Sequence, residues 1–98
     1  MIQLNDGNRM PRIGLGLYEV DASSWSVRLI RIAVNEGYRL FDTAQLYENE
    51  HETGYALKAS RIPRDQFVIT TKLYTTANGR SQVLHSFHQS LHRLMIDY

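Results

Sequence analysis

Residues 67–73 read FVITTKL, and this stretch is the clearest strand signal in the chain. β-Branched and aromatic residues dominate it and polar residues bound it, which is typical of a buried strand. Working back along the chain, residues 39–43 (RLFDT) and 14–18 (GLGLY) are two further strand candidates. Apolar residues recur at helical spacing in the segments between and after these strands, which predicts three helices, over residues 23–37, 49–60 and 80–96.

Polar and flexible residues mark the helix ends. Ser23 or Ser24 can cap the first helix, because a serine oxygen accepts a hydrogen bond from a free amide of the first turn. Gly37 is placed to end that helix, and Asn49 is placed to cap the second. The third helix is predicted to pack through one apolar stripe, made of Val83, Leu84, Phe87, Leu91, Leu94 and Met95.

The order of the elements indicates the fold class. Asn5-Asp6-Gly7-Asn8 is a tight-turn signal, and it predicts a short hairpin between residues 2–4 and 9–13. Strands then alternate with helices three times, which implies parallel strands joined by right-handed crossovers. Parallel sheets are normally covered on both faces. Three helices on one side leave the other face bare unless further strands close the sheet on itself, so the pattern indicates an α/β chain that is part of something larger.

Composition narrows the function classes. The chain has 98 residues, a formal charge of +1 and no cysteine. The charge balance disfavours a protein that binds a nucleic-acid backbone. The lack of cysteine excludes disulfides, thiolate zinc sites and cysteine nucleophiles. No apolar run approaches the ~20 residues of a membrane span, and the start has no signal-peptide core. We therefore expect one soluble domain in a reducing compartment, most simply the cytoplasm.

Three residues stand at the ends of the predicted strands, and a fourth follows nearby. Tyr18, Asp42 and Lys72 end the three strands, and Tyr47 follows Asp42 by five residues. Neighbouring strands lie ~4.8 Å apart, so Asp42 and Lys72 can pair. A phenol is a poor proton donor at neutral pH, because its ordinary pKa is near 10. An ammonium ~4 Å away stabilises a phenolate by about 4 kcal/mol at an effective dielectric of 20. Such a trio suits proton delivery to a carbonyl oxygen that gains negative charge.

Three segments of the chain resemble the beginning of an aldo-keto reductase. They are LNDGNRMPRIGLGLY (4–18), EGYRLFDTAQLYENEHETG (36–54) and RDQFVITTKLY (64–74), which occur in the family's order. The closest branch is the one with the aldose, aldehyde and hydroxysteroid reductases. The resemblance implies the first part of an eight-stranded (β/α)8 TIM barrel, with the β-hairpin followed by about three βα units. It also implies an oxidoreductase in which NADPH reduces small-molecule aldehydes or ketones, with no metal.

The resemblance also assigns roles by position. It implies that Tyr47 donates the proton, that Lys72 makes this phenol a better donor, and that Asp42 pairs with the lysine. Tyr18 and Tyr47 are expected to line the substrate pocket. The resemblance also implies that Asp42 and the stretch 14–18 contact the cofactor. This stretch consists of Gly14, Leu15, Gly16, Leu17 and Tyr18.

Two departures from the family pattern matter. Leu17 stands where relatives commonly carry threonine. The family continues after Asp97-Tyr98 with a fourth strand that ends in a histidine, which orients the substrate carbonyl; none of the four histidines of this chain stands at that position. We therefore expect residues 1–98 to form a single partial reductase domain, cut before the fourth barrel strand and inactive alone.

Two alternatives stay open at this stage. The first is a non-enzymatic truncated product, which either binds a partner through the uncovered sheet face or has no function. The second is a metal-binding helix, because His85, His88 and His92 lie along one side of the third predicted helix. No carboxylate or cysteine completes a ligand set beside them, so the sequence favours a solvated helix face over a metal site.

Overall fold

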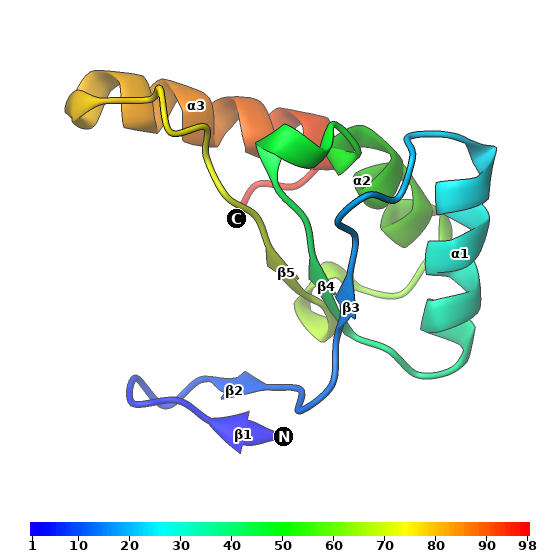
Figure 1. Cartoon of the computed structure of the whole chain (residues 1–98). Coiled ribbons are helices and arrows are strands. Elements are labelled where there is room, and N and C mark those ends of the chain that lie inside the picture. Colours follow the sequence, from blue (N-terminus) through cyan, green and yellow to red (C-terminus); the bar gives the residue numbers. More distant parts are fainter.

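Parallel strands and helices alternate along the chain in the computed structural model, which describes residues 1–98 (Figure 1). The sheet has the order β3-β4-β5, with all neighbours parallel. The prediction of an α/β chain with three βα units is therefore confirmed. The elements after the hairpin are β3 (Leu15–Gly16), α1 (Ser24–Asn35), β4 (Leu40–Asp42), the 3-10 turn η1 (Gln45–Tyr47), α2 (Glu50–Ala59), the 3-10 turn η2 (Arg64–Gln66), β5 (Val68–Thr70) and α3 (Gly79–Leu94).

The predicted hairpin precedes this sheet. Strands β1 (Ile2–Gln3) and β2 (Arg9–Met10) pair antiparallel, with Ile2 opposite Met10. The Leu4 N–H donates to the Asn8 carbonyl oxygen at 2.8 Å and so closes the turn. Figure 1 shows the hairpin beyond the amino-terminal ends of the three parallel strands, on the side of the sheet opposite to the strand ends that carry the candidate site.

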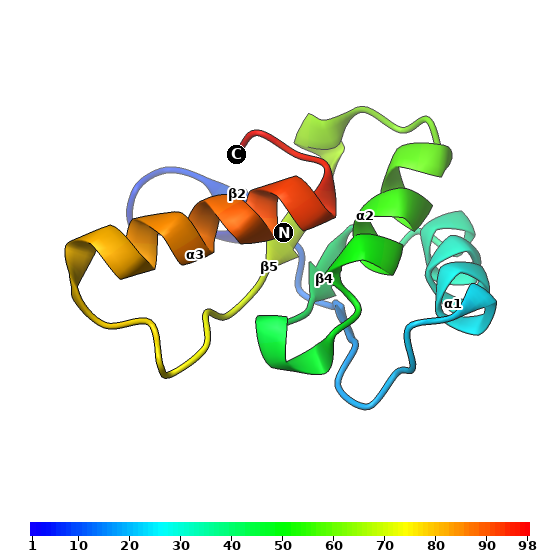
Figure 2. The same ribbon diagram turned by 90° about the horizontal axis from the view of Figure 1, so that it is seen from above.

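The hydrophobic core lies between one face of the sheet and the helices. Phe41 of β4 is fully buried, and its ring meets that of Phe67 at 6.1 Å between centroids. Figure 2 shows the helices side by side in the order α1, α2, α3. Leu40 and Val68 are paired across β4 and β5, alternate with Phe41 along the pleat and so point to the opposite face, where both are only partly buried. The core consists of Leu17, Ile30, Ala33, Val34, Phe41, Ala56, Leu57 and Phe67.

The ends of α1 follow the sequence signals. Ser23 is the N-cap, and its Oγ accepts a hydrogen bond from the Trp25 N–H at 3.2 Å. Gly37 adopts φ +99°, a conformation that a residue without Cβ adopts at little cost. Asn49 occupies the N-cap position of α2, but the prediction that its side chain caps the helix is wrong. Its amide donates instead to the carbonyl oxygens of Leu17 and Val20, both at 2.9 Å.

Two sequence expectations about the last elements need correction. Strand β5 covers only Val68–Thr70, so Lys72 lies two residues beyond the strand end. The apolar stripe predicted as the packing face of α3 is exposed in its first half, at Val83, Leu84 and Phe87, whereas its second half is buried at Leu94 and half-buried at Leu91 and Met95. The buried row of this helix is Ser86, Ser90 and Leu94. The serines are buried because they meet a polar side chain from the turn after β4.

Candidate active site

The carboxyl ends of the three parallel strands bring the predicted site residues together. Gly16, Asp42 and Thr70 are direct neighbours across β3, β4 and β5. The Leu17 N–H donates to the Asp42 carbonyl oxygen at 2.9 Å, and the Thr43 N–H donates to the Thr70 carbonyl oxygen at 2.8 Å. These backbone bonds continue the ladder beyond the strands and fix the backbone of Asp42 at the sheet edge, where Thr70 and Lys72 bond to its carboxylate.

Lys72 reaches back from the segment after β5 to this edge. Its Nζ lies 3.0 Å and 2.9 Å from the two carboxylate oxygens of Asp42, and it also donates to the Thr43 carbonyl oxygen at 3.1 Å. The Lys72 and Asp42 side chains are 53% and 42% exposed. The ion pair therefore faces an open region at the strand ends, where a ligand can approach it.

Tyr47 lies beside this ion pair, although it comes from the turn η1. The Lys72 ammonium is 5.1 Å from the centre of the Tyr47 ring, within the range of a cation–π contact. The Tyr47 ring also meets that of Tyr18, with centroids 5.3 Å apart and planes tilted by 59°. Tyr18 itself is 65% exposed. The structure thus gathers Tyr18, Asp42, Tyr47 and Lys72 at one end of the sheet.

The two charges of the pair shift each other's protonation. Partial burial pushes the pKa of Asp42 upward, but the hydrogen bonds from Thr70 and Lys72 and the lysine charge outweigh this and hold the pKa below its ordinary value. The hydrogen bond to Asp42 raises the pKa of Lys72 above its ordinary value, against a smaller opposing effect of burial, and Tyr47 adds to the rise. Both groups are therefore firmly charged at neutral pH.

The residues expected to contact the cofactor differ in what they present. A Cβ at Gly16 would meet no atom within 4 Å, so open space adjoins the backbone next to Asp42. A Cβ at Gly14 would lie 2.6 Å from the Leu40 side chain, so that side of Gly14 is filled. Leu17 is fully buried and Leu15 packs against the core. Gly14, Gly16 and Tyr18 are exposed and Asp42 is half-buried, so these four residues offer free surface beside the strand ends.

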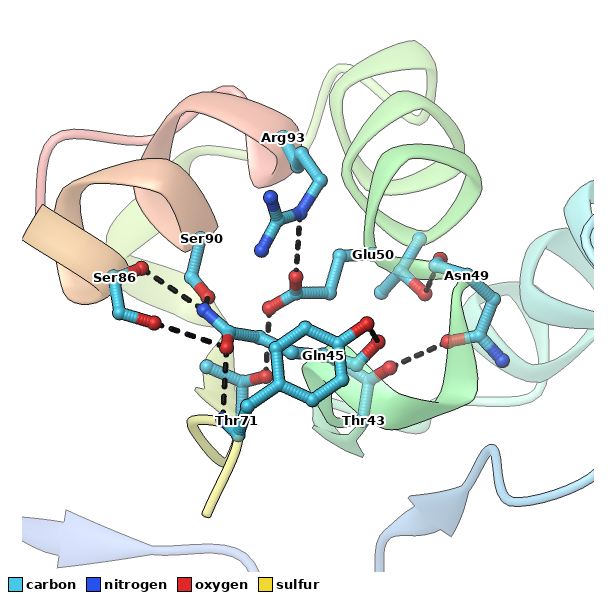
Figure 3. A network of polar contacts seen from close by, with 10 residues as sticks. Thr43, Gln45, Asn49, Glu50, Thr71, Ser86, Ser90 and Arg93 are labelled. Atoms are coloured by element: carbon cyan, nitrogen blue, oxygen red, sulfur yellow. Dashed lines mark hydrogen bonds and ion pairs between the residues drawn. The ribbon is translucent and has the colours of Figure 1, made fainter. Parts of the chain in front are cut away.

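A buried polar network behind the site was not predicted from the sequence (Figure 3). The Glu50 carboxylate accepts from the Arg93 Nε–H and the Thr71 hydroxyl, each at 2.7 Å. The Gln45 side chain bonds to α3. Thr70, which donates its hydroxyl proton to the Asp42 carboxylate, was also missed. Threonine is ordinary in strands, so only its register opposite Asp42 could have pointed to it.

The structure supports neither a membrane span nor a metal centre. None of the helices combines the length and apolar character needed to cross a bilayer. His85, His88 and His92 are exposed, and nowhere in the chain do three histidine, aspartate or glutamate side chains come close enough to hold a metal ion. The histidine row of α3 is thus a solvated helix face in this structure.

In βα-barrel enzymes the functional residues lie at the carboxyl ends of the parallel strands, which is where Tyr18, Asp42, Tyr47 and Lys72 gather in this chain. The model of the aldo/keto reductase family matches residues 12–98. The chain belongs to this family.

Relatives and solved structures agree with this assignment. Glyoxal reductase of Bacillus subtilis is 35% identical over 99% of this chain and 35% of its own length. The crystal structure of MGS-M4, an aldo-keto reductase from a Medee basin deep-sea metagenome library, matches with a TM-score of 0.94 at 40% identity, over 100% of this chain and 36% of that one. The crystal structure of an aldo-keto reductase of Bombyx mori in complex with NADP matches with a TM-score of 0.91 at 33% identity. The match covers 99% of this chain and 34% of that one. The chain thus spans about a third of these barrels.

Proposed function

We propose that the chain carries the proton-donating part of an NADPH-dependent reductase that converts aldehydes and ketones to alcohols. The observation that supports this proposal best is the grouping of Tyr47, Lys72 and Asp42 at the strand ends, where the Lys72 ammonium bonds to the Asp42 carboxylate and lies 5.1 Å from the centre of the Tyr47 ring. Three residues from separate segments converge there on an open surface. A structural ion pair alone would not require the tyrosine.

In this mechanism the Tyr47 hydroxyl donates its proton to the carbonyl oxygen of the substrate. The Lys72 ammonium stabilises the negative charge left on the phenol oxygen, and Asp42 holds the ammonium in place. When bound, NADPH supplies the hydride that reduces the carbonyl carbon. Hydride and proton together convert the carbonyl to an alcohol, and the phenolate of Tyr47 recovers its proton from solvent.

The open surface beside the trio is the proposed place for the cofactor and substrate. Gly16 and Asp42 would hold the nicotinamide riboside end, with Gly14 and Leu15 contributing backbone groups. The backbone groups of Leu17 are already bonded within the protein, so Leu17 would support this surface from below. Tyr18 and Tyr47 form an aromatic corner for the substrate. The complex of the Bombyx mori relative with NADP supports this cofactor class.

The chain by itself is expected to show negligible reductase activity, because it spans about a third of the length of its relatives. The purified 98-residue chain is mixed with NADPH and an aromatic aldehyde, and absorbance follows the loss of the reduced cofactor. Steady oxidation above the background would overturn this expectation.

A chimaera tests the role of the trio itself. This chain replaces the matching 35% of the Bacillus subtilis glyoxal reductase, and NADPH oxidation is measured with glyoxal. Tyr47→Phe should lower kcat by about 10²–10⁴, the range for losing a general acid. Tyr55→Phe is the matched control, since Tyr55 is an exposed tyrosine on α2. Equal kcat values for the two variants would refute the role of Tyr47.

The exposed stripe of α3 favours a second candidate, a non-enzymatic chain that acts through partner binding. Val83, Leu84 and Phe87 are 38%, 42% and 43% exposed on one side of the helix. Contiguous apolar surface of this kind is typical of interfaces. Sedimentation of the 98-residue chain over a range of concentrations, with Phe87→Ser for comparison, tests it. A chain that stays monomeric and binds no apolar dye speaks against this candidate.

A further inference from the structure

Gln45 is a buried polar side chain that makes every hydrogen bond its amide can make. It is only 3% exposed. Its Nε2 donates to the Ser86 carbonyl oxygen and to Ser90 Oγ, both at 2.9 Å. Its Oε1 accepts from the Tyr74 N–H at 2.9 Å and from Ser86 Oγ at 3.0 Å. Figure 3 shows the amide pointing from its turn toward the two serines of α3.

The backbone of the same residue ties a third segment to this point. The Gln45 N–H donates to the Lys72 carbonyl oxygen at 3.0 Å, and the Gln45 carbonyl oxygen accepts from the Tyr74 hydroxyl at 3.1 Å. Gln45 therefore joins the turn η1 both to α3 and to residues 72–74. The latter segment carries the lysine of the proposed site.

The turn η1 is too short to hold its own shape. It covers three residues, Gln45–Tyr47, and is followed by Glu48 at φ +56°. Its local bonds run from the Tyr47 N–H to the Ala44 carbonyl oxygen and from the Glu48 N–H to the Gln45 carbonyl oxygen. A single turn is not stable in isolation, because nucleation costs more than one or two hydrogen bonds return. The position of Tyr47 must therefore come from anchors on either side.

The anchor on the C-terminal side is already accounted for by other residues. The Asn49 amide donates to the backbone of the segment after β3, and Glu50 is paired with Arg93. On the N-terminal side Gln45 is the buried polar anchor, two residues before Tyr47. The partners of its side chain lie 29 to 45 positions away in the sequence, so it fixes where the turn sits relative to the rest of the fold.

We propose that Gln45 is a positioning residue for the carbonyl reduction proposed above, on which this inference rests. Its side-chain amide holds the turn that carries Tyr47 against α3 and against the backbone after β5. The Tyr47 ring and the Lys72 ammonium thereby stay side by side. Gln45 has no free hydrogen-bonding group in its side chain and is buried, so it acts on the reaction through Tyr47 and the segment that carries Lys72.

The test compares Gln45→Met with Val34→Ala in the 98-residue chain. Methionine keeps the length of the side chain and removes all four hydrogen bonds, and Val34 is a core residue of α1 remote from the site. NMR measures the nuclear Overhauser contact between the Tyr47 ring and the Lys72 side chain, and the exchange rate of the Tyr47 amide. We expect Gln45→Met to weaken the contact and to speed this exchange on the order of tenfold more than Val34→Ala, at matched global stability.

Each outcome of this test decides the proposal. If the Tyr47–Lys72 contact and the Tyr47 amide exchange rate change by the same amount in both variants at equal global stability, Gln45 contributes to stability only and the proposal fails. If Gln45→Met does not fold, Ser90→Ala removes a single partner of the amide and is measured in the same way, with Ser90→Thr as the variant that keeps the hydroxyl. A smaller loss in Ser90→Ala that Ser90→Thr restores supports the proposal, and no difference between them overturns it. These readouts need no turnover, so they stand apart from the chimaera assay of the proposed function.

Discussion

Gly54 of α2 lies directly against the backbone of Leu94 in α3. A Cβ atom at position 54 would fall 2.3 Å from the Leu94 carbonyl oxygen and 2.6 Å from its Cα. No side chain can be accommodated at that distance without moving the helix backbone. The absence of a side chain at this one position therefore sets the spacing of α2 and α3. This spacing also places Ser86 and Ser90 of α3, which hydrogen-bond to Gln45.

Gly54→Ala should destabilise the chain by about 1–3 kcal/mol, the usual cost of inserting atoms into a packed region. The clash is with backbone, which cannot rotate away as a flexible side chain would. Urea unfolding followed by circular dichroism measures the loss. Gly16→Ala is the matched control, because a Cβ there meets nothing within 4 Å. Equal stabilities of the two variants would show that α2 and α3 can separate freely.

Thr70→Val should raise the pKa of Asp42 toward its ordinary value. Valine has the shape of threonine but cannot donate the hydrogen bond that Asp42 accepts, and this bond is one of the causes that hold the pKa down. The ion pair with Lys72 is left in place. Carbon-13 NMR of the Asp42 carboxyl group gives the titration directly. Thr70→Ser keeps the hydroxyl and should leave the pKa of Asp42 unchanged. If Asp42 has the same pKa in the valine and serine variants, the Thr70 hydroxyl does not contribute to the lowered pKa.

The sequence predicted the ends of helices correctly where they depend on residues close together in the chain. Ser23 and Gly37 bound α1 as expected, since capping and positive φ depend on neighbours in sequence. The face of α3 was predicted wrongly in its first half, where the apolar stripe and the serine row are adjacent on the helix surface, whereas Leu94 at its end is buried as expected. Which of them is buried depends on Gln45, about 40 residues earlier, and no local pattern reports that contact.

The candidate site shows the same division between local and long-range information. Asp42 and Lys72 could be proposed from their places at strand ends, because the ends of parallel strands converge. The positions of Gln45 and Glu50 in a buried network could not be predicted in this way. Their partners come from a distant helix, and a glutamine or glutamate in a polar stretch is usually exposed.

The Asp42–Lys72 pair should stabilise the chain over a defined pH window. The pKa of Asp42 is lowered from 3.8, so its contribution is present above that value and is lost as the pH falls through the lowered pKa. The pKa of Lys72 is raised from 10.5, so its contribution is complete below that value and is lost as the pH rises through the raised pKa. The difference in unfolding free energy between the chain and Asp42→Asn should therefore be flat across neutral pH and shrink at both extremes. Its plateau should be about 0.2–1 kcal/mol, because both side chains are exposed; a difference that stays constant while the pH falls through the titration of Asp42 contradicts the prediction.

Removing the arginine from the Glu50–Arg93 pair should cost more than removing an exposed arginine from the same helix. Glu50 is 1% exposed, and without Arg93 its buried carboxylate keeps only the hydrogen bond from Thr71. Arg93→Met should lower the unfolding free energy by about 3 kcal/mol, the lower end for an uncompensated buried charge, since Arg93 is itself 38% exposed and water can reach it. Arg80→Met, in the exposed first turn of α3, should change stability by less than about 0.5 kcal/mol. Adding Glu50→Gln to Arg93→Met removes the unpaired charge and should recover part of the loss. Urea unfolding of the unchanged chain and these three variants measures the differences. If the double variant is no more stable than Arg93→Met, the loss comes from the packing of the arginine stem and not from the buried charge.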